Sequence, residues 1–122
     1  PDNIIRSKGL FWISSRPDQA LIWSQAGGSL KSDSAGVWWS SMPYESRIQQ
    51  NSFVENIDLI ESDWDVNFGD RKNEIVFIGQ NLDKALICSQ LEKCLVENKY
   101  LENSNWKLGY EDTWPVERTY PI

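Results

Sequence analysis

Two strand-like runs joined by a short turn constrain the fold of this chain more than any other feature. The runs are Leu10–Ser14 and Leu21–Ala26, and both are rich in the apolar, β-branched and aromatic residues that suit a pleated sheet. Between them, residues 16–19 (RPDQ) predict a turn, because Pro17 presets its backbone angle and Asp18 can cap it. The sequence therefore predicts a β-hairpin within residues 4–28.

A third strand and an amphipathic helix are predicted next. Residues Ser29–Ser40 read as a strand that is bent or bulged at Gly36. Trp38 and Trp39 would then point to opposite faces, with one of them in the core. The helix predicted over Ser52–Asp63 carries one apolar stripe, whose members are four, three and four residues apart. The stripe consists of Phe53, Ile57, Ile60 and Trp64.

A further strand and helix complete the pattern. Residues Glu74–Gly79 (EIVFIG) form a continuous apolar run, which favours a strand that is covered on both faces or placed centrally. A last helix is predicted from about Leu82 to Asn98, capped by Asn81 or Asp83. Its expected buried stripe is Ile87, Leu91, Cys94 and Leu95. The order β-β-β-α-β-α predicts an α+β domain, an antiparallel sheet of about four strands with two helices packed on one face.

The C-terminal tail is rich in aromatic residues but has little periodicity. Its aromatic residues include Trp106, Tyr110, Trp114 and Tyr120, and Pro115 and Pro121 bar regular structure. Burying one such ring contributes roughly 2–3 kcal/mol, so we expect the tail to pack across the body. At a length of 122 residues the chain is expected to be a single domain, 1–122, with a core of about 4–98 and an irregular packed tail of about 99–122.

Charge and cysteine usage narrow the classes of partner and compartment. The net charge of −6 disfavours nucleic acid and anionic membranes, because phosphate binding is driven by Lys and Arg. Cys88 and Cys94 are six residues apart in the predicted last helix, so their thiols should diverge and form neither a disulfide nor a shared metal site. Two buried, reduced thiols are the favoured interpretation, which suits a cytoplasmic location.

The inventory of catalytic residues is sparse. The sequence has no histidine and no G-x-x-x-x-G-K-[ST] motif, so it predicts neither a His-dependent catalytic site nor a nucleotide-binding P-loop. We therefore expect this chain not to be an enzyme. An acidic loop around Trp64 is the weak candidate for metal or acid–base chemistry, although its spacing departs from the calcium-loop pattern and a solvated loop is the favoured interpretation. Its candidate residues are Asp63, Asp65 and Asp70.

An interaction surface is the other candidate. Arg6 and Lys8 alternate, so they share one face if the first strand extends back to them, pointing opposite to Ser7. They could hold a phosphate or an acidic partner, or they could only protect a sheet edge by charge. The tryptophans could line a ligand groove or fill the core. The candidate interaction surface comprises Arg6, Lys8, Trp12 and Trp23.

A series of short motifs, in order along the chain, resembles the C-terminal domain of CobW-like GTPases. In the hairpin they are RSKG at 6–9, FW at 11–12, RP at 16–17 and WSQAGG at 23–28. Further along they are WW at 38–39, DWD at 63–65, FGDR at 68–71, VFIG at 76–79 and LD at 82–83. The resemblance runs from about Ile4 to Cys94, and the tail beyond Leu95 matches only loosely.

The resemblance implies a domain of a cytoplasmic metallochaperone GTPase involved in cobalt or zinc homeostasis or in cobalamin synthesis. In that family the nucleotide site and a C-x-C-C metal motif lie in an N-terminal GTPase domain, and this sequence contains neither motif. GTP, magnesium and a transition metal are therefore expected for the full-length protein, and no cofactor in this chain. The implied partners are its own N-terminal GTPase domain and a metal-requiring client protein, with homo-oligomers as a further expectation through an unpaired sheet edge.

Two hypotheses follow from these observations. The first is a non-catalytic regulatory or protein-interaction domain of a CobW-like metallochaperone GTPase. The second is a stand-alone ligand- or metal-binding module that uses the Trp-lined surface or the acidic loop Glu61–Asp70. The first rests on the resemblance, and the second rests on the residues alone.

Overall fold

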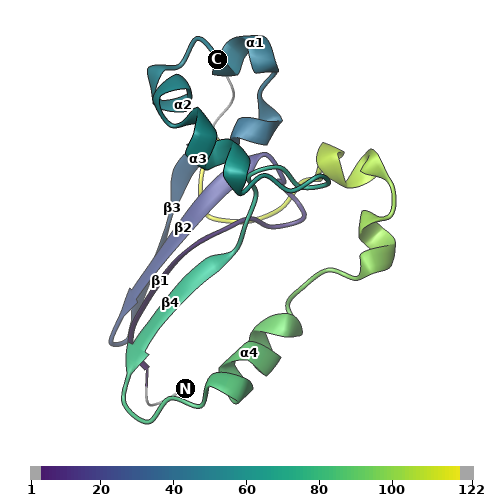
Figure 1. Ribbon diagram of the computed structural model, residues 1–122. Coiled ribbons are helices and arrows are strands. Elements are labelled where there is room, and N and C mark those ends of the chain that lie inside the picture. Colours follow the sequence, from purple (N-terminus) through teal and green to yellow (C-terminus); the bar gives the residue numbers. More distant parts are fainter. Residues whose placement is uncertain (1–3, 119–122) are drawn as a thin grey trace.

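A four-stranded sheet with the predicted hairpin at its centre organises residues 4–118, the part of the chain that this computed structural model describes (Figure 1). The strands are β1 (Ile4–Phe11), β2 (Gln19–Ala26), β3 (Ser29–Val37) and β4 (Glu74–Gly79). Their order across the sheet is β3-β2-β1-β4, and all neighbouring strands are antiparallel. The predicted α+β class and its antiparallel sheet of four strands are confirmed.

Strand β1 begins earlier than predicted. The predicted run was Leu10–Ser14, whereas the polar stretch 6–9 forms the middle of the observed strand. This stretch is extended because it is paired on both sides, with Ser7 opposite Gln25 of β2 and opposite Phe77 of β4. Ladder hydrogen bonds on two sides outweigh a weak local preference for strand. Ser7 is buried and Arg6 and Lys8 are exposed, as the alternation predicts.

Strands β3 and β4 differ in how well they match their predictions. The register of β3 shifts where Ala20 and Leu21 face Gly36 and Ser34, which confirms the predicted bulge beside Gly36. Strand β4 has the predicted bounds, but the prediction that it is central or covered on both faces is wrong. It pairs only with β1 among the described strands, and the exposure of its residues alternates.

The predicted helix over Ser52–Asp63 is divided into two short helices. They are α2 (Asn51–Glu55) and α3 (Ile57–Ser62), and they follow η1 (Trp39–Ser41) and α1 (Tyr44–Arg47). The break lies at Asn56, where the backbone leaves the helical region with φ −118°. The side-chain amide of Asn56 donates to the carbonyl of Ser52 at 2.9 Å, an alternative to helical backbone bonding.

The last predicted helix is shorter than expected. Helix α4 (Lys84–Glu92) is capped by Asp83, whose carboxylate accepts from the Leu86 N–H at 3.0 Å, and this confirms one of the two predicted caps. The prediction of a helix to Asn98 with a buried stripe is wrong, because α4 has no buried residue. The prediction of buried thiols is also wrong, since Cys88 and Cys94 are both exposed.

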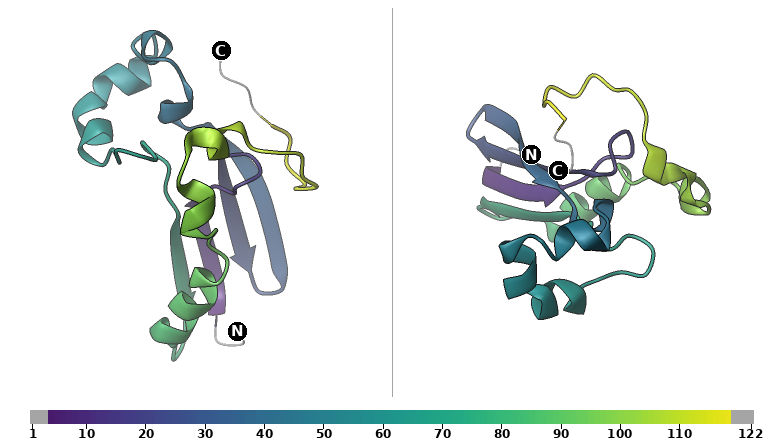
Figure 2. Two further views of the ribbon diagram at one scale, coloured as in Figure 1. Left: turned by 90° about the vertical axis from the view of Figure 1, so that its right-hand side faces the viewer. Right: turned by 90° about the horizontal axis from the view of Figure 1, so that it is seen from above.

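The helices are distributed unevenly around the sheet. Helices α1 to α3 lie beyond one end of the sheet, and α4 lies along one side of it (Figure 1). The tail, with η2 (Asn98–Leu101) and η3 (Ser104–Leu108), continues on the same side as α4 (Figure 2). No described element crosses the opposite face. The buried apolar residues are Phe11, Ala20, Leu21, Trp38, Met42, Phe53 and Trp106.

The tail packs on the body, as predicted. Trp106 is buried, and the Tyr110 N–H donates to the carbonyl of Ser15 at 2.7 Å. Trp114 contacts Phe11 edge-on, with ring centroids 5.8 Å apart. Tyr120 and Pro121, which were included in the tail prediction, lie outside the described residues.

Candidate functional site

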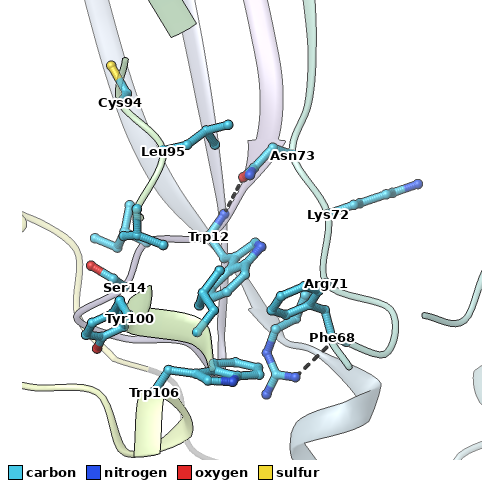
Figure 3. Close-up of a pocket in the computed structure, with 13 residues that line it drawn as sticks. Trp12, Ser14, Phe68, Arg71, Lys72, Asn73, Cys94, Leu95, Tyr100 and Trp106 are labelled. Atoms are coloured by element: carbon cyan, nitrogen blue, oxygen red, sulfur yellow. Dashed lines mark hydrogen bonds between the residues drawn. The ribbon is translucent and has the colours of Figure 1, made fainter. Parts of the chain in front are cut away.

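An aromatic hollow lies where the loops at the end of the sheet meet the tail (Figure 3). Its volume is about 450 Å³, and its walls come from three segments. Trp12 and Ser14 follow β1, Phe68 and Arg71 precede β4, and Trp106 belongs to the tail. The hollow therefore joins parts of the chain that are far apart in sequence.

Three rings and one guanidinium group define this hollow. The ring centroids of Trp12, Phe68 and Trp106 are 5.3 to 5.9 Å apart, and all three pairs are tilted. The Arg71 guanidinium lies 5.1 Å from the Trp106 ring centroid. Its Nε donates to the Pro17 carbonyl at 2.7 Å. Burial of this guanidinium lowers the pKa of Arg71 from its ordinary value. Arg71 therefore ties the loop to the hairpin turn.

A second, larger cavity of about 690 Å³ lies between the sheet and α4. Its sheet side includes Phe11, Trp23 and Ile75, and its helix side includes Cys88 and Leu91. It shares lining residues with the aromatic hollow, so the two form adjoining spaces. The exposure of the α4 side chains follows from this space, because the helix does not close onto the sheet.

An ion pair between the buried Arg16 and the half-buried Asp112 anchors the tail beside these cavities. Arg16 donates to both carboxylate oxygens of Asp112, from Nε at 2.9 Å and from Nη2. Its Nη1 donates to the Val116 carbonyl at 2.6 Å. The hydrogen bond from Arg16, with others from Ser15 and the Trp114 N–H, holds the pKa of Asp112 well below its usual range. Arg16 thus fixes residues 112–116 to the hairpin turn.

The four residues of the candidate interaction surface lie on two different surfaces. Arg6 and Lys8 lie on the open face of the sheet. Trp12 and Trp23 line the larger cavity on the other side. The Trp23 indole N–H donates to the Ser7 hydroxyl at 3.2 Å, which confirms that Trp23 shares the face of Ser7. The structure therefore keeps each pair together and separates the two pairs.

The acidic-loop carboxylates bond to backbone N–H groups. One Asp65 oxygen accepts from the N–H groups of Asn67 and Phe68 at 2.8 and 2.9 Å. Asp70 accepts from the N–H groups of Trp39 and Ser40 at 2.8 and 2.9 Å. Asp63 is exposed. Within residues 4–118, no group of three or more His, Cys, Asp or Glu residues is arranged to hold a metal ion.

The sequence interpretation missed the two arginines that organise this region. Arg16 and Asp112 are separated by 96 positions, so no local pattern connects them. Arg71 was noted only within the motif FGDR at 68–71, and its Nε donates to the Pro17 carbonyl. The available signal was that each arginine stands among aromatic residues, in FWISSRP and in FGDR.

None of the described helices is long and apolar enough to span a bilayer.

Comparison with known proteins identifies the family. Residues 1–95 match the family described as the cobalamin synthesis protein cobW C-terminal domain. A zinc-regulated GTPase metalloprotein activator of Dictyostelium discoideum is 36% identical over 103 residues, which are 80% of this chain and 20% of that protein. A zinc chaperone of Mycobacterium tuberculosis is 26% identical over 113 residues, 91% of this chain and 27% of that protein. No solved structure gives a significant match.

These matches cover most of this chain but only part of each relative. The chain spans about a fifth to a quarter of the length of the curated relatives it matches. The family match covers the hairpin, the helical insertion and β4, and it continues past α4 to residue 95. The resemblance seen in the sequence is thereby confirmed, and this chain belongs to the CobW C-terminal domain family.

Proposed function

We propose that this chain is a non-catalytic regulatory or partner-binding domain of a metallochaperone GTPase. The family match and the small share of each relative that the chain covers support this assignment. The GTP, magnesium and transition-metal sites would then belong to the rest of the protein. Zinc is the favoured metal, because two relatives are named for zinc.

The observation that carries this proposal is the uncovered sheet face. Val76 and Ile78 are 47% and 56% exposed on β4, beside the exposed Arg6 and Lys8 of β1. A sheet face with exposed apolar side chains is typical of a surface that another protein covers. The GTPase domain is the first partner expected, and a metal-requiring client protein in the cytoplasm is the second.

A binding titration tests the proposal. The 122-residue chain is titrated into the Dictyostelium relative from which the matching segment has been removed. We expect saturable one-to-one binding whose affinity changes between the GTP-bound and GDP-bound forms. Absence of binding in every nucleotide and zinc state would contradict the proposal. The intact relative, whose own segment competes, is the control.

A stand-alone ligand-binding module is the second candidate. The larger cavity of about 690 Å³ has the size of a small-molecule site. On its wall, the indole nitrogen of Trp114 is buried and has no partner among the described residues. A ligand with an apolar body and one acceptor atom would fit these walls. Micromolar binding of such a compound, weakened by Trp114→Phe, would favour this candidate. Calorimetry with zinc would separately test a metal role for Asp65 and Asp70 of the acidic loop.

A further inference from the structure

The sheet face opposite α4 presents an ordered array of side chains. Alternation along the strands and the pairing register place this array in three rows across the four strands. The first row is Ile78, Arg6, Ala26 and Ser29. The second row is Val76, Lys8, Ser24 and Lys31. The third row is Glu74, Leu10, Ile22 and Asp33.

Positive charge is concentrated in the first two rows. We call the part of these rows formed by Arg6, Lys8, Ser24 and Lys31 the cationic face. The backbones of Lys8 and Lys31 are two strands apart, about 10 Å, and those of Arg6 and Lys8 are about 7 Å apart. A shallow hollow of about 420 Å³ is bordered by these residues. Three cations are therefore within reach of one short ligand.

The cations of this face are available for a partner. The side chains of Arg6 and Lys8 make no hydrogen bond or ion pair with any residue from 4 to 118. Lys31 lies 3.6 Å from Asp33, and both side chains are largely exposed. Exposed ion pairs of this kind contribute little free energy, so Lys31 can exchange Asp33 for a carboxylate of a partner.

Edge protection does not account for Arg6 and Lys8. Charged residues protect a sheet when they lie on an unpaired edge strand. Strand β1 is paired with β2 on one side and β4 on the other, so it is a central strand. The alternative that the sequence left open therefore fails for these two residues, and the cations need another explanation.

We propose that the cationic face docks an acidic and partly apolar segment of a partner protein. Carboxylates of this segment meet Arg6, Lys8 and Lys31, and its apolar side chains cover Val76 and Ile78. The inference rests on the proposed function and adds the chemistry of the partner. The net charge of −6, with acidic Glu74 and Asp33 at the ends of the third row, disfavours long polyanions and anionic membranes.

A peptide titration on the full 122-residue chain tests this inference. The probe is a seven-residue peptide of alternating glutamate and valine, and its match has glutamine in place of glutamate. We expect the acidic peptide to shift backbone amide NMR signals of β1, β2 and β3, and to bind at least about tenfold more tightly than the glutamine peptide. Its affinity should fall as salt rises.

Two charge-reversed variants provide the matched comparison. The double variant Arg6→Glu with Lys8→Glu should lower the affinity for the acidic peptide at least about tenfold. Lys84→Glu with Lys93→Glu, on exposed residues at the two ends of α4, changes the net charge equally and should leave the affinity within about twofold. If the first variant does not fold, Arg6→Gln with Lys8→Gln replaces it, with the same direction expected.

Three outcomes would overturn the inference. They are equal weakening by both variants, no preference for the acidic peptide, and tighter binding of inorganic phosphate or phosphatidylserine vesicles to this face. The results also distinguish failure of this inference from failure of the proposed function. A chain that binds the peptide here but never the GTPase portion retains this inference and loses the proposed function. A chain whose charge-reversed variant binds the GTPase portion normally retains the proposed function and loses this inference.

Discussion

Removing one charge from the Arg16–Asp112 pair tests how the tail is held. The variant Asp112→Asn keeps the shape of the side chain and leaves the Arg16 guanidinium without its counter-charge. The side chains are 4% and 14% exposed, so little water can replace the lost carboxylate. Arg16 would keep its bond to the Val116 carbonyl, and the amide oxygen of the new residue could accept one bond.

The expected loss follows from these contacts. Removing one partner of a fully buried ion pair typically costs about 3–5 kcal/mol. Because some bonds remain and Asp112 is partly exposed, we expect about 2–3 kcal/mol. In urea, with a denaturant slope of about 1.5 kcal/mol/M, this lowers the unfolding midpoint by about 1.5 M. If the tail detaches before the sheet unfolds, the Tyr110 amide, bonded to the Ser15 carbonyl, should exchange about 30- to 150-fold faster.

Urea unfolding followed by tryptophan fluorescence, together with amide exchange, measures both effects. Glu111→Gln is the matched control, since it removes one negative charge from the adjacent exposed residue. The pKa of Asp112 is depressed in the folded state, so the stabilisation is complete above the unfolded-state pKa of about 4 and is lost as the pH falls further. The difference between the two proteins should therefore shrink below about pH 4. A midpoint shift and an exchange rate equal to those of the control would show that the Arg16–Asp112 pair does not hold the tail.

Three further predictions concern the loop before β4 and the thiols. Gly69→Ala should destabilise the fold by at least about 2 kcal/mol in urea unfolding, because φ is +66° and an added Cβ would clash with the Cβ of Ser40. A loss below about 0.5 kcal/mol would contradict this. Asp70→Asn should lower the free energy of unfolding by about 1–2 kcal/mol, since the Asp70 carboxylate accepts from the backbone N–H groups of Trp39 and Ser40. An unchanged unfolding midpoint in urea would contradict this. Cys88 and Cys94 should both react with a thiol reagent without denaturant, and two unreactive thiols would disprove their exposure.

The parts of the fold that the sequence predicted well are those with a strong local pattern. The run Glu74–Gly79 is a strand with the predicted bounds, and Asp83 caps α4 as expected. The double glycine after β2 forms a turn, with Gly27 at φ +59°. In each case the pattern lies within a few residues, so no distant contact is needed to specify it.

The errors arise where distant contacts decide the structure. The start of β1 depends on pairing with β2 and β4, which the composition of residues 6–9 does not reveal. The exposure of Cys88 and Cys94 depends on how closely α4 approaches the sheet. The pairing of Arg16 with Asp112 spans 96 positions and has no periodic signature. The cationic face required knowledge that β1 is central, since alternation alone left edge protection open.

GTP turnover of a chimera tests whether this domain acts on the GTPase part of the protein. The matching segment of the Dictyostelium relative is replaced by this chain, and turnover is compared with that of the relative truncated before the segment. We expect the chain to alter turnover or its response to zinc in the chimera, whereas the isolated chain hydrolyses no GTP. A chimera whose turnover and zinc response equal those of the truncated protein would contradict a regulatory or partner-binding role.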